Sequence, residues 1–167
     1  DHGHPDTKLY PRAEIGIFSN RTEIEIGLNG GKYEVNLSLE LDEYDSDTFQ
    51  GDLIFQRYIG KYFNFFAGAD YREKDLTAIL GAAYVLPMQI QVRAQVNHKG
   101  KFLVRLSKSF PITDKLVLEP SVAYEYDEFE TESKLIYKIT NNMGVGMFHK
   151  WTRDRNHSVG VGLTFRF

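Results

Sequence analysis

Apolar and polar residues alternate strictly in Tyr33-Glu34-Val35-Asn36-Leu37-Ser38-Leu39-Glu40-Leu41, with every odd position apolar and every even position polar. Successive side chains of a β-strand point to opposite faces, so this pattern predicts a strand with one apolar and one polar face. Residues 88–97 and 158–167 repeat the alternation. No segment sustains the period of an amphipathic helix, and the sequence therefore predicts an all-β protein.

Turn-forming residues and charge runs interrupt the alternation at regular intervals. They divide the chain into about twelve strands of roughly ten residues, the length that a tilted strand needs to cross a bilayer. The predicted strands cover residues 9–18, 22–29, 32–42, 48–58, 62–72, 76–86, 88–97, 101–110, 115–126, 130–140, 142–151 and 157–167. Residues 9–167 are thus predicted to form one barrel, and residues 1–8 a flexible tail before it.

The predicted connections alternate between two kinds. Tight connections lie at residues 29–31, 58–61, 86–87, 111–114 and 141–142, whereas more charged ones lie at 42–47, 72–75, 98–101, 127–130 and 152–156. Outer-membrane barrels have short turns on the periplasmic side and longer polar loops outside. With an even number of strands, this arrangement predicts that both termini are periplasmic, with Asp1 directly after a removed signal peptide.

The alternation alone does not say whether the apolar face points inward, as in a soluble lipocalin-like barrel, or outward to lipid. Three features favour a closed antiparallel transmembrane β-barrel. About twelve strands would leave a soluble barrel too wide to fill with side chains. Aromatic residues gather near predicted strand ends, as in interfacial girdles. The polar face also carries small residues suited to a crowded lumen: Gly16, Gly27, Gly68, Gly81, Gly144, Gly146, Gly160 and Gly162.

The last predicted strand ends on an aromatic residue, Phe167. A terminal Phe after alternating apolar residues resembles the signal that the barrel-assembly machinery reads in outer-membrane proteins. We therefore expect this machinery and outer-membrane lipids as partners, a monomeric barrel, and location in the outer membrane of a Gram-negative bacterium.

Composition excludes several other classes of protein. The 167 residues carry 20 Lys and Arg against 23 Asp and Glu, a formal net charge of −3, which offers no basic surface for nucleic acid. The absence of Cys excludes disulfides and thiolate metal sites. No run of about 18 apolar residues is present, so no transmembrane helix is predicted.

With the apolar face toward lipid, the charged residues of the opposite face line the lumen. Early strands contribute mainly acids and later strands mainly bases: Glu14, Glu23, Glu25, Glu34, Glu40, Asp52 and Asp70, then Arg93, Arg105, Glu119, Glu125, Lys134, Lys138, Lys150 and Arg166. Two interpretations stay open. The charges either pair across a plugged lumen of low conductance, or form separated acidic and basic walls of a narrow pore for small ions.

Candidate chemistry is limited to one Ser-His pair and five histidines. His157 and Ser158 are neighbours in a predicted strand, so their side chains point to opposite faces and no enzyme is predicted. His2 and His4, with the α-amine of Asp1, fit Cu(II) or Ni(II). Three further candidate ligands lie near predicted extracellular ends, and the last two can approach across one hairpin: His98, His149 and His157. The alternative is that each is a solvated or interfacial histidine.

A series of short motifs resembles the copper resistance protein B family of outer-membrane proteins. The resemblance runs in the family's order through residues 27–31, 52–57, 67–72, 80–87, 112–120 and 133–137. It implies a role in copper homeostasis or export, with copper as the bound metal and periplasmic copper proteins as partners. The chain departs from the family in its histidines at the N-terminus, where only His2 and His4 stand in place of a long Met- and His-rich leader. The alternative function is a structural or small-solute pore with no metal role.

Overall fold

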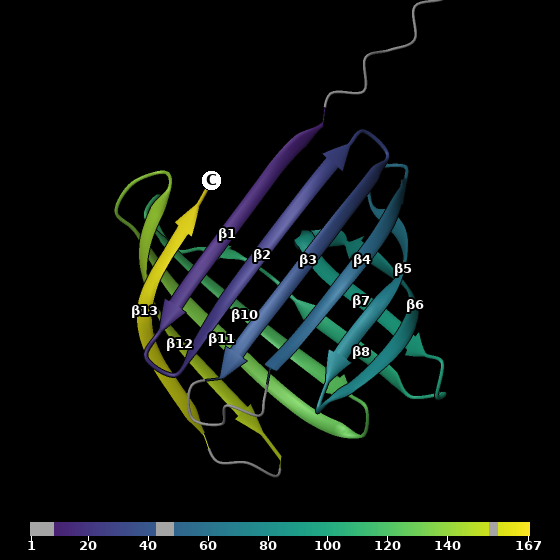
Figure 1. The fold of residues 1–167 in the computed structure, drawn as a ribbon. Coiled ribbons are helices and arrows are strands. Elements are labelled where there is room, and N and C mark those ends of the chain that lie inside the picture. The colour runs from purple at the N-terminus through teal and green to yellow at the C-terminus, as the bar shows by residue number, and fades with distance from the viewer. Residues whose placement is uncertain (1–8, 43–48, 154–156) are drawn as a thin grey trace, which may run out of the picture.

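The computed structural model describes residues 9–42, 49–153 and 157–167, which form one antiparallel sheet closed on itself (Figure 1). The strands are β1 (Tyr10–Phe18), β2 (Arg21–Gly30), β3 (Tyr33–Asp42), β4 (Phe49–Ile59), β5 (Phe63–Arg72), β6 (Asp75–Leu86), β7 (Ile90–Asn97), β8 (Phe102–Ser107), β9 (Phe110–Pro111), β10 (Leu116–Glu125), β11 (Glu128–Lys138), β12 (Met143–Thr152) and β13 (Ser158–Arg166). One 3-10 turn, η1 (Pro87–Gln89), joins β6 to β7. No helix in the described residues is long and apolar enough to cross a membrane.

The sheet closes where the last strand pairs with the first. Glu14 lies opposite Arg166 and Phe18 opposite Gly162 in the β1–β13 ladder, while the other edge of β1 pairs with β2. The closed antiparallel 12-strand barrel predicted from the alternation is therefore confirmed. Both described ends of the chain lie at the same end of the barrel (Figure 1). We call this end, which carries the β2–β3 and β11–β12 connections, the turn end, and the opposite end the loop end.

The eighth predicted strand, residues 101–110, forms two pieces rather than one. β8 and β9 both pair with β10, but the chain leaves the ladder between them at Lys108 and Ser109. Lys108 N donates to the carbonyl oxygen of Pro120, at 3.1 Å, and Pro120 has no N–H to donate in return. The interruption follows from this missing hydrogen bond, so β8 and β9 count as one strand of the barrel.

Two loop-end connections are shorter than the sequence predicts. Arg72 pairs with Asp75, and Glu125 with Glu128, so each hairpin has only two residues in its turn. The turn residues 73–74 and 126–127 all have positive φ. This geometry matches the twist of the flanking strands. The first three residues of β11, Glu128 to Glu130, therefore belong to a strand, although the predicted connection covers residues 127–130.

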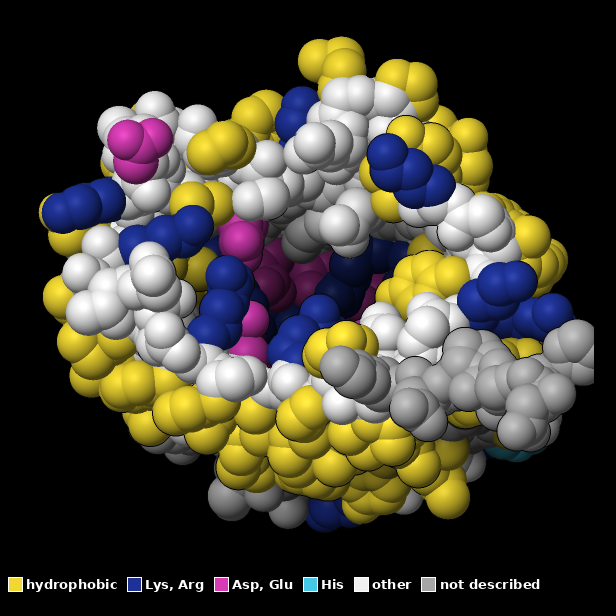
Figure 2. Space-filling model, turned by 90° about the horizontal axis from the view of Figure 1, so that it is seen from above, with side chains coloured by type: hydrophobic (Ala, Val, Ile, Leu, Met, Phe, Trp, Pro, Cys, Tyr) yellow, Lys and Arg dark blue, Asp and Glu magenta, His cyan; other side chains and the backbone are white. Residues whose placement is uncertain are grey.

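The apolar face of the sheet points outward. In β3, Tyr33 and Leu41 are 46% and 45% exposed, whereas Glu34 between them in the alternation is 6% exposed. Figure 2 shows apolar side chains around the outside and charged side chains within the central hollow. The soluble alternative requires the reverse orientation and is therefore excluded.

Aromatic side chains gather on the outer wall near both ends of the barrel. At the turn end Tyr33 stacks on Phe55 with ring centroids 5.7 Å apart, and Phe63 contacts Tyr84 at 6.2 Å. At the loop end the contacting pairs are Phe49–Tyr71, Phe102–Tyr124 and Phe129–Trp151. Two aromatic belts with an apolar band between them are the arrangement expected of a barrel that spans a bilayer.

Two inward glycines allow close packing around Phe18. A Cβ added to Gly16 would meet the ring of Phe18 at 2.8 Å, and a Cβ at Gly162 would collide with the backbone of Ile17 and Phe18. Phe18 in turn packs on Phe148, which is fully buried, with centroids 6.0 Å apart. The glycines therefore allow an apolar contact to fill the wall of the lumen beside β12, β13 and β1.

Candidate functional site

The lumen contains two cavities of about 600 and 770 Å³. The first reaches Arg12 and Tyr58 at the turn end, and the second reaches Lys99 and Tyr126 at the loop end. Eight residues line both cavities and therefore separate them; we call these residues the constriction ring: Arg21, Glu40, Gln50, Asp70, Arg72, Glu125, Glu130 and Lys150. They come from seven different strands, so the ring exists only in the closed barrel.

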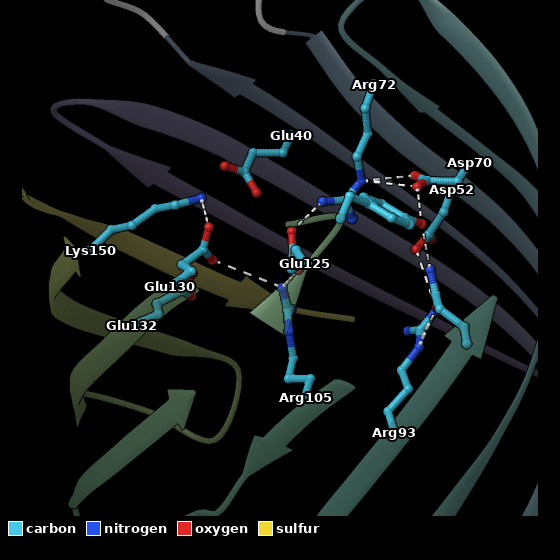
Figure 3. A network of polar contacts seen from close by, with 12 residues as sticks. Glu40, Asp52, Asp70, Arg72, Arg93, Arg105, Glu125, Glu130, Glu132 and Lys150 are labelled. Atoms are coloured by element: carbon cyan, nitrogen blue, oxygen red, sulfur yellow. Dashed lines mark hydrogen bonds and ion pairs between the residues drawn. The ribbon is translucent and has the colours of Figure 1, made fainter. Parts of the chain in front are cut away.

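One set of ion pairs crosses the lumen from β5. The Arg72 guanidinium donates to Asp70 at 2.9 Å and to Glu125 of β10 at 2.5 Å (Figure 3). Three strands separate β5 from β10 around the barrel, so this pair is a bridge through the interior. Glu125 also accepts from Arg105, and Lys150 pairs with Glu130 at 2.9 Å. Arg105 lies 3.9 Å from Glu130, which makes the charged chain continuous from β5 to β12.

Tyr126 supports this bridge from the turn between β10 and β11. Its hydroxyl donates to Asp70 at 3.0 Å and accepts from the Gln95 amide at 3.0 Å. Burial raises the pKa of Tyr126, so the phenol stays protonated and keeps its role as a donor.

A second set of ion pairs links β2 to β11, which are also separated by three strands. Arg21 donates to Glu132 at 3.0 Å and to Glu40 at 3.1 Å, and it also pairs with Glu23. Lys134 donates to Glu23 at 2.6 Å. The Arg21 guanidinium lies 3.4 Å from the centroid of the Phe148 ring, which adds a cation–π contact to the bridge.

A third link closes off the side of the lumen at β4 to β7. Arg93 lies 3.7 Å from Asp52 across the two intervening strands and 4.6 Å from the centroid of Phe66. Below this link, Phe66 packs with Ile54 and Ile79 in a small apolar cluster. Asp52, Phe66 and Arg93 therefore form part of the wall of the first cavity on this side of the lumen.

The turn-end mouth carries its own ion pairs. Arg12 donates to Glu25 at 2.6 Å and to Glu34 at 3.2 Å, and the Tyr58 hydroxyl donates to Glu34 at 2.5 Å. Across the barrel seam, Arg166 donates to Glu14 at 3.0 Å. These pairs hold charged groups along the mouth without closing it, since the hollow is visible from above (Figure 2).

The structure places nearly all charged residues predicted to face the lumen on the wall of the first cavity. The exceptions are Arg166, which pairs with Glu14 at the mouth, and Lys138, which is exposed and lines neither cavity. Sequence reasoning missed Arg12, Arg21, Arg72, Glu130 and Glu132. All five share the inward period of their strands. Arg21 lies between two predicted strands, and Arg72 and Glu130 lie where a predicted strand and a predicted connection overlap. Arg12 and Glu132 lie within predicted strands but were not included among the predicted lumen residues.

These missed residues argue against the second interpretation, in which acidic and basic residues form separate walls. Arg12 and Arg21 lie among the acids of the early strands, and Glu130 and Glu132 lie among the bases of the late strands. Acidic and basic residues are therefore interspersed around the lumen and do not form two opposite walls.

The candidate metal ligands are in three places. His2 and His4 lie outside the described residues. His98, after β7, accepts a hydrogen bond at Nδ1 from Ala78 N at 3.0 Å. His149 and His157 meet on the outer wall, with Nε2 and Nδ1 3.1 Å apart. Within residues 9–42, 49–153 and 157–167, no three His, Cys, Asp or Glu side chains are grouped to hold a metal ion.

Ser158, the first residue of β13, and His157, directly before it, point to opposite faces of the barrel wall. The Ser158 hydroxyl accepts from Asn20 at 2.5 Å and lines the loop-end cavity, whereas the His157 ring contacts His149 outside. The imidazole therefore has no access to the hydroxyl, and the pair cannot act as a nucleophile and its base.

No family model and no curated protein matches the sequence. Solved structures match the fold. The KdgM porin superposes with a TM-score of 0.62 at 9% identity over 94% of this chain and 98% of that one, and its complex with disordered oligogalacturonate gives 0.64 at 9% over the same shares. A triple mutant of the Rhodopseudomonas blastica porin gives 0.53 at 15% identity, over 89% of this chain and 56% of that one. The chain therefore has the barrel fold of outer-membrane porins.

Proposed function

We propose that this protein is a narrow pore for small polar solutes in the outer membrane of a Gram-negative bacterium, with a preference for cations. The observation that carries the proposal is the pair of charged cavities that meet at the constriction ring inside an apolar-walled barrel. The likeness of the fold to porins supports it. Solutes diffuse passively through such a pore, and the width and charge of the lumen determine which solutes pass.

The preference for cations follows from the charges on the wall. Eleven carboxylates line the first cavity against seven Lys and Arg side chains. Each Lys and Arg side chain on this wall belongs to an ion pair. The carboxylates outnumber these side chains, so the lumen carries a net negative charge. The low-dielectric wall strengthens the electric field of the net negative charge within the lumen. This field raises the local concentration of small cations.

Conductance of single proteins in planar bilayers tests the pore. We expect small, stable conductance steps for the wild-type protein. Under a KCl gradient, the sign of the reversal potential should indicate cation selectivity. In Arg72→Ala the β5–β10 bridge is lost, so steps become larger. Arg57→Ala is the matched control, because Arg57 points outward and lies 5.7 Å from the Tyr33 ring.

The heat-dependent shift in gel migration that folded barrels show would verify that each variant has folded. Folded wild-type protein and folded Arg72→Ala that both fail to conduct would contradict the pore. Conduction with anion selectivity would contradict the charge argument while leaving the pore intact.

A role in copper handling, implied by the resemblance to the copper resistance protein B family, is the second candidate. The observation that favours it is the contact between His149 and His157. If the role holds, cells that lack the protein differ in copper sensitivity from cells that carry it, and a His149→Ala/His157→Ala variant fails to restore the difference. Full restoration by that variant would contradict a copper role at this pair.

A further inference from the structure

Two imidazoles from neighbouring strands meet on the outer wall at the loop end. His149 of β12 lies opposite Val159 of β13, and His157 is the diagonal neighbour two residues before Val159. Diagonal neighbours lie within reach of long or aromatic side chains. The ring centroids are 5.3 Å apart, and Nε2 of His149 lies 3.1 Å from Nδ1 of His157.

This contact constrains the protonation of the pair. Two ring nitrogens at hydrogen-bond distance need one donor and one acceptor, so at least one of the imidazoles is neutral and directs a lone pair at its partner. The contact therefore consists of two imidazole nitrogens that share one proton. A metal ion that binds imidazole replaces such a proton and uses the lone pairs of both rings.

The separation of the nitrogens suits two ligands of one ion. Metal–imidazole distances of about 2.0–2.1 Å place two ligands at neighbouring positions about 2.9–3.4 Å apart, for angles between square-planar and tetrahedral. The observed 3.1 Å lies within this range. Binding of a common ion requires the two rings to rotate about their side-chain torsions so that both lone pairs point at it.

The position of the pair allows an ion to enter from water. His157 is exposed and His149 is half-buried, and both lie beside the loop-end aromatic belt, where Trp151 contacts Phe129. Nitrogen ligands select Cu²⁺, Ni²⁺ or Zn²⁺ over Ca²⁺ and Mg²⁺, which prefer oxygen. The described residues supply two ligands, so water completes the coordination.

We propose that His149 and His157 form a bidentate site for a divalent transition-metal ion, which links β12 to β13 on the outer wall. The site is separate from the lumen, so it does not rest on the proposed pore. It predicts that bound metal stabilises the last hairpin of the barrel.

A Cu²⁺ titration of the full-length, detergent-folded protein tests the site. His2→Ala/His4→Ala is the background, since those residues are separate candidate ligands. We expect one equivalent of Cu²⁺ to bind, with nitrogen hyperfine coupling from two imidazoles in the electron paramagnetic resonance spectrum. His149→Ala and His157→Ala should each weaken binding by more than about tenfold, because loss of a ligand costs more than loss of a group that supports one.

His98→Ala is the matched control, because it removes a histidine that lies across the barrel and accepts from Ala78. It should leave the affinity unchanged. Equal affinity in the His149→Ala protein, or displacement of Cu²⁺ by a modest excess of Mg²⁺, would overturn the site. Because both histidines lie on the outer surface of a hairpin, gel migration should show folded barrels for all variants, and a loss of binding then reports on the ligands.

Discussion

At the scale of single residues, Arg21 holds together three acids from two sides of the barrel. It pairs with Glu23, Glu40 and Glu132 and stacks on Phe148. The side chain is 4% exposed, so its removal leaves these carboxylates close together in the interior without their shared cation. Breaking a buried ion pair from one side costs more than the pair contributes, because the remaining charge stays desolvated.

Arg21→Ala is therefore expected to lower the free energy of unfolding by about 3 kcal/mol or more. Urea unfolding in lipid vesicles, followed by Trp151 fluorescence, measures the loss. Arg57→Ala, an outward substitution of the same type, should change stability by less than about 0.5 kcal/mol. Equal stabilities of the two variants would show that the β2–β11 bridge contributes nothing to the fold.

At the scale of the elements, the seam between β1 and β13 decides whether the sheet closes. Phe167 N donates to Ala13 O at 2.8 Å, and Ala13 N donates to Phe167 O at 3.1 Å. The side chain of Phe167 is largely exposed. The backbone of Phe167 therefore contributes to closure, while its exposed ring is not needed for these hydrogen bonds.

Deletion of Phe167 and the substitution Phe167→Ala separate these roles. The deletion removes both hydrogen bonds to Ala13, so it should lower the unfolding midpoint of the purified barrel, whereas Phe167→Ala should leave it nearly unchanged. If the ring is read by the assembly machinery, Phe167→Ala should still reduce the amount of folded protein in cells. Normal amounts in cells would contradict that expectation.

At the scale of the whole molecule, the proposed cation selectivity depends on the excess of carboxylates in the lumen. Glu40 belongs to the constriction ring, and Arg21 keeps Glu23 and Glu132 as partners when Glu40 is neutralised. Glu40→Gln should therefore move the reversal potential in a KCl gradient toward zero, with little change in single-channel conductance. Asp114→Asn, on an exposed turn outside both cavities, should leave selectivity unchanged. A reversal potential that shifts equally in both variants would rule out a specific role for the ring.

The sequence also limited what could be predicted of the loop end. Glu73-Lys74 and Tyr126-Asp127 adopt positive φ in two-residue turns, although neither pair is the Asn-Gly or Asp-Gly that usually marks this geometry. The surrounding ladders impose the turn because the register of β5 with β6, and of β10 with β11, continues to the last pair. Arg72 and Glu130 lie at these boundaries, where a predicted strand and a predicted connection overlap, and neither was included among the residues predicted to face the lumen.

The sequence by itself determined the all-β class and the division of each strand into an apolar and a polar face. A period of two places alternate residues on opposite faces of a strand, so the pattern in residues 33–41 already divides an apolar wall from a polar one. Only the tertiary structure decided which charges meet. Arg72 and Glu125, or Arg21 and Glu132, belong to strands separated by three others, and their contacts arise when the sheet curves and closes. The contact of His149 with His157 was determined partly by the sequence and partly by the structure. The sequence predicts that the two residues approach across one hairpin, but the register of β12 on β13 sets the distance between the rings.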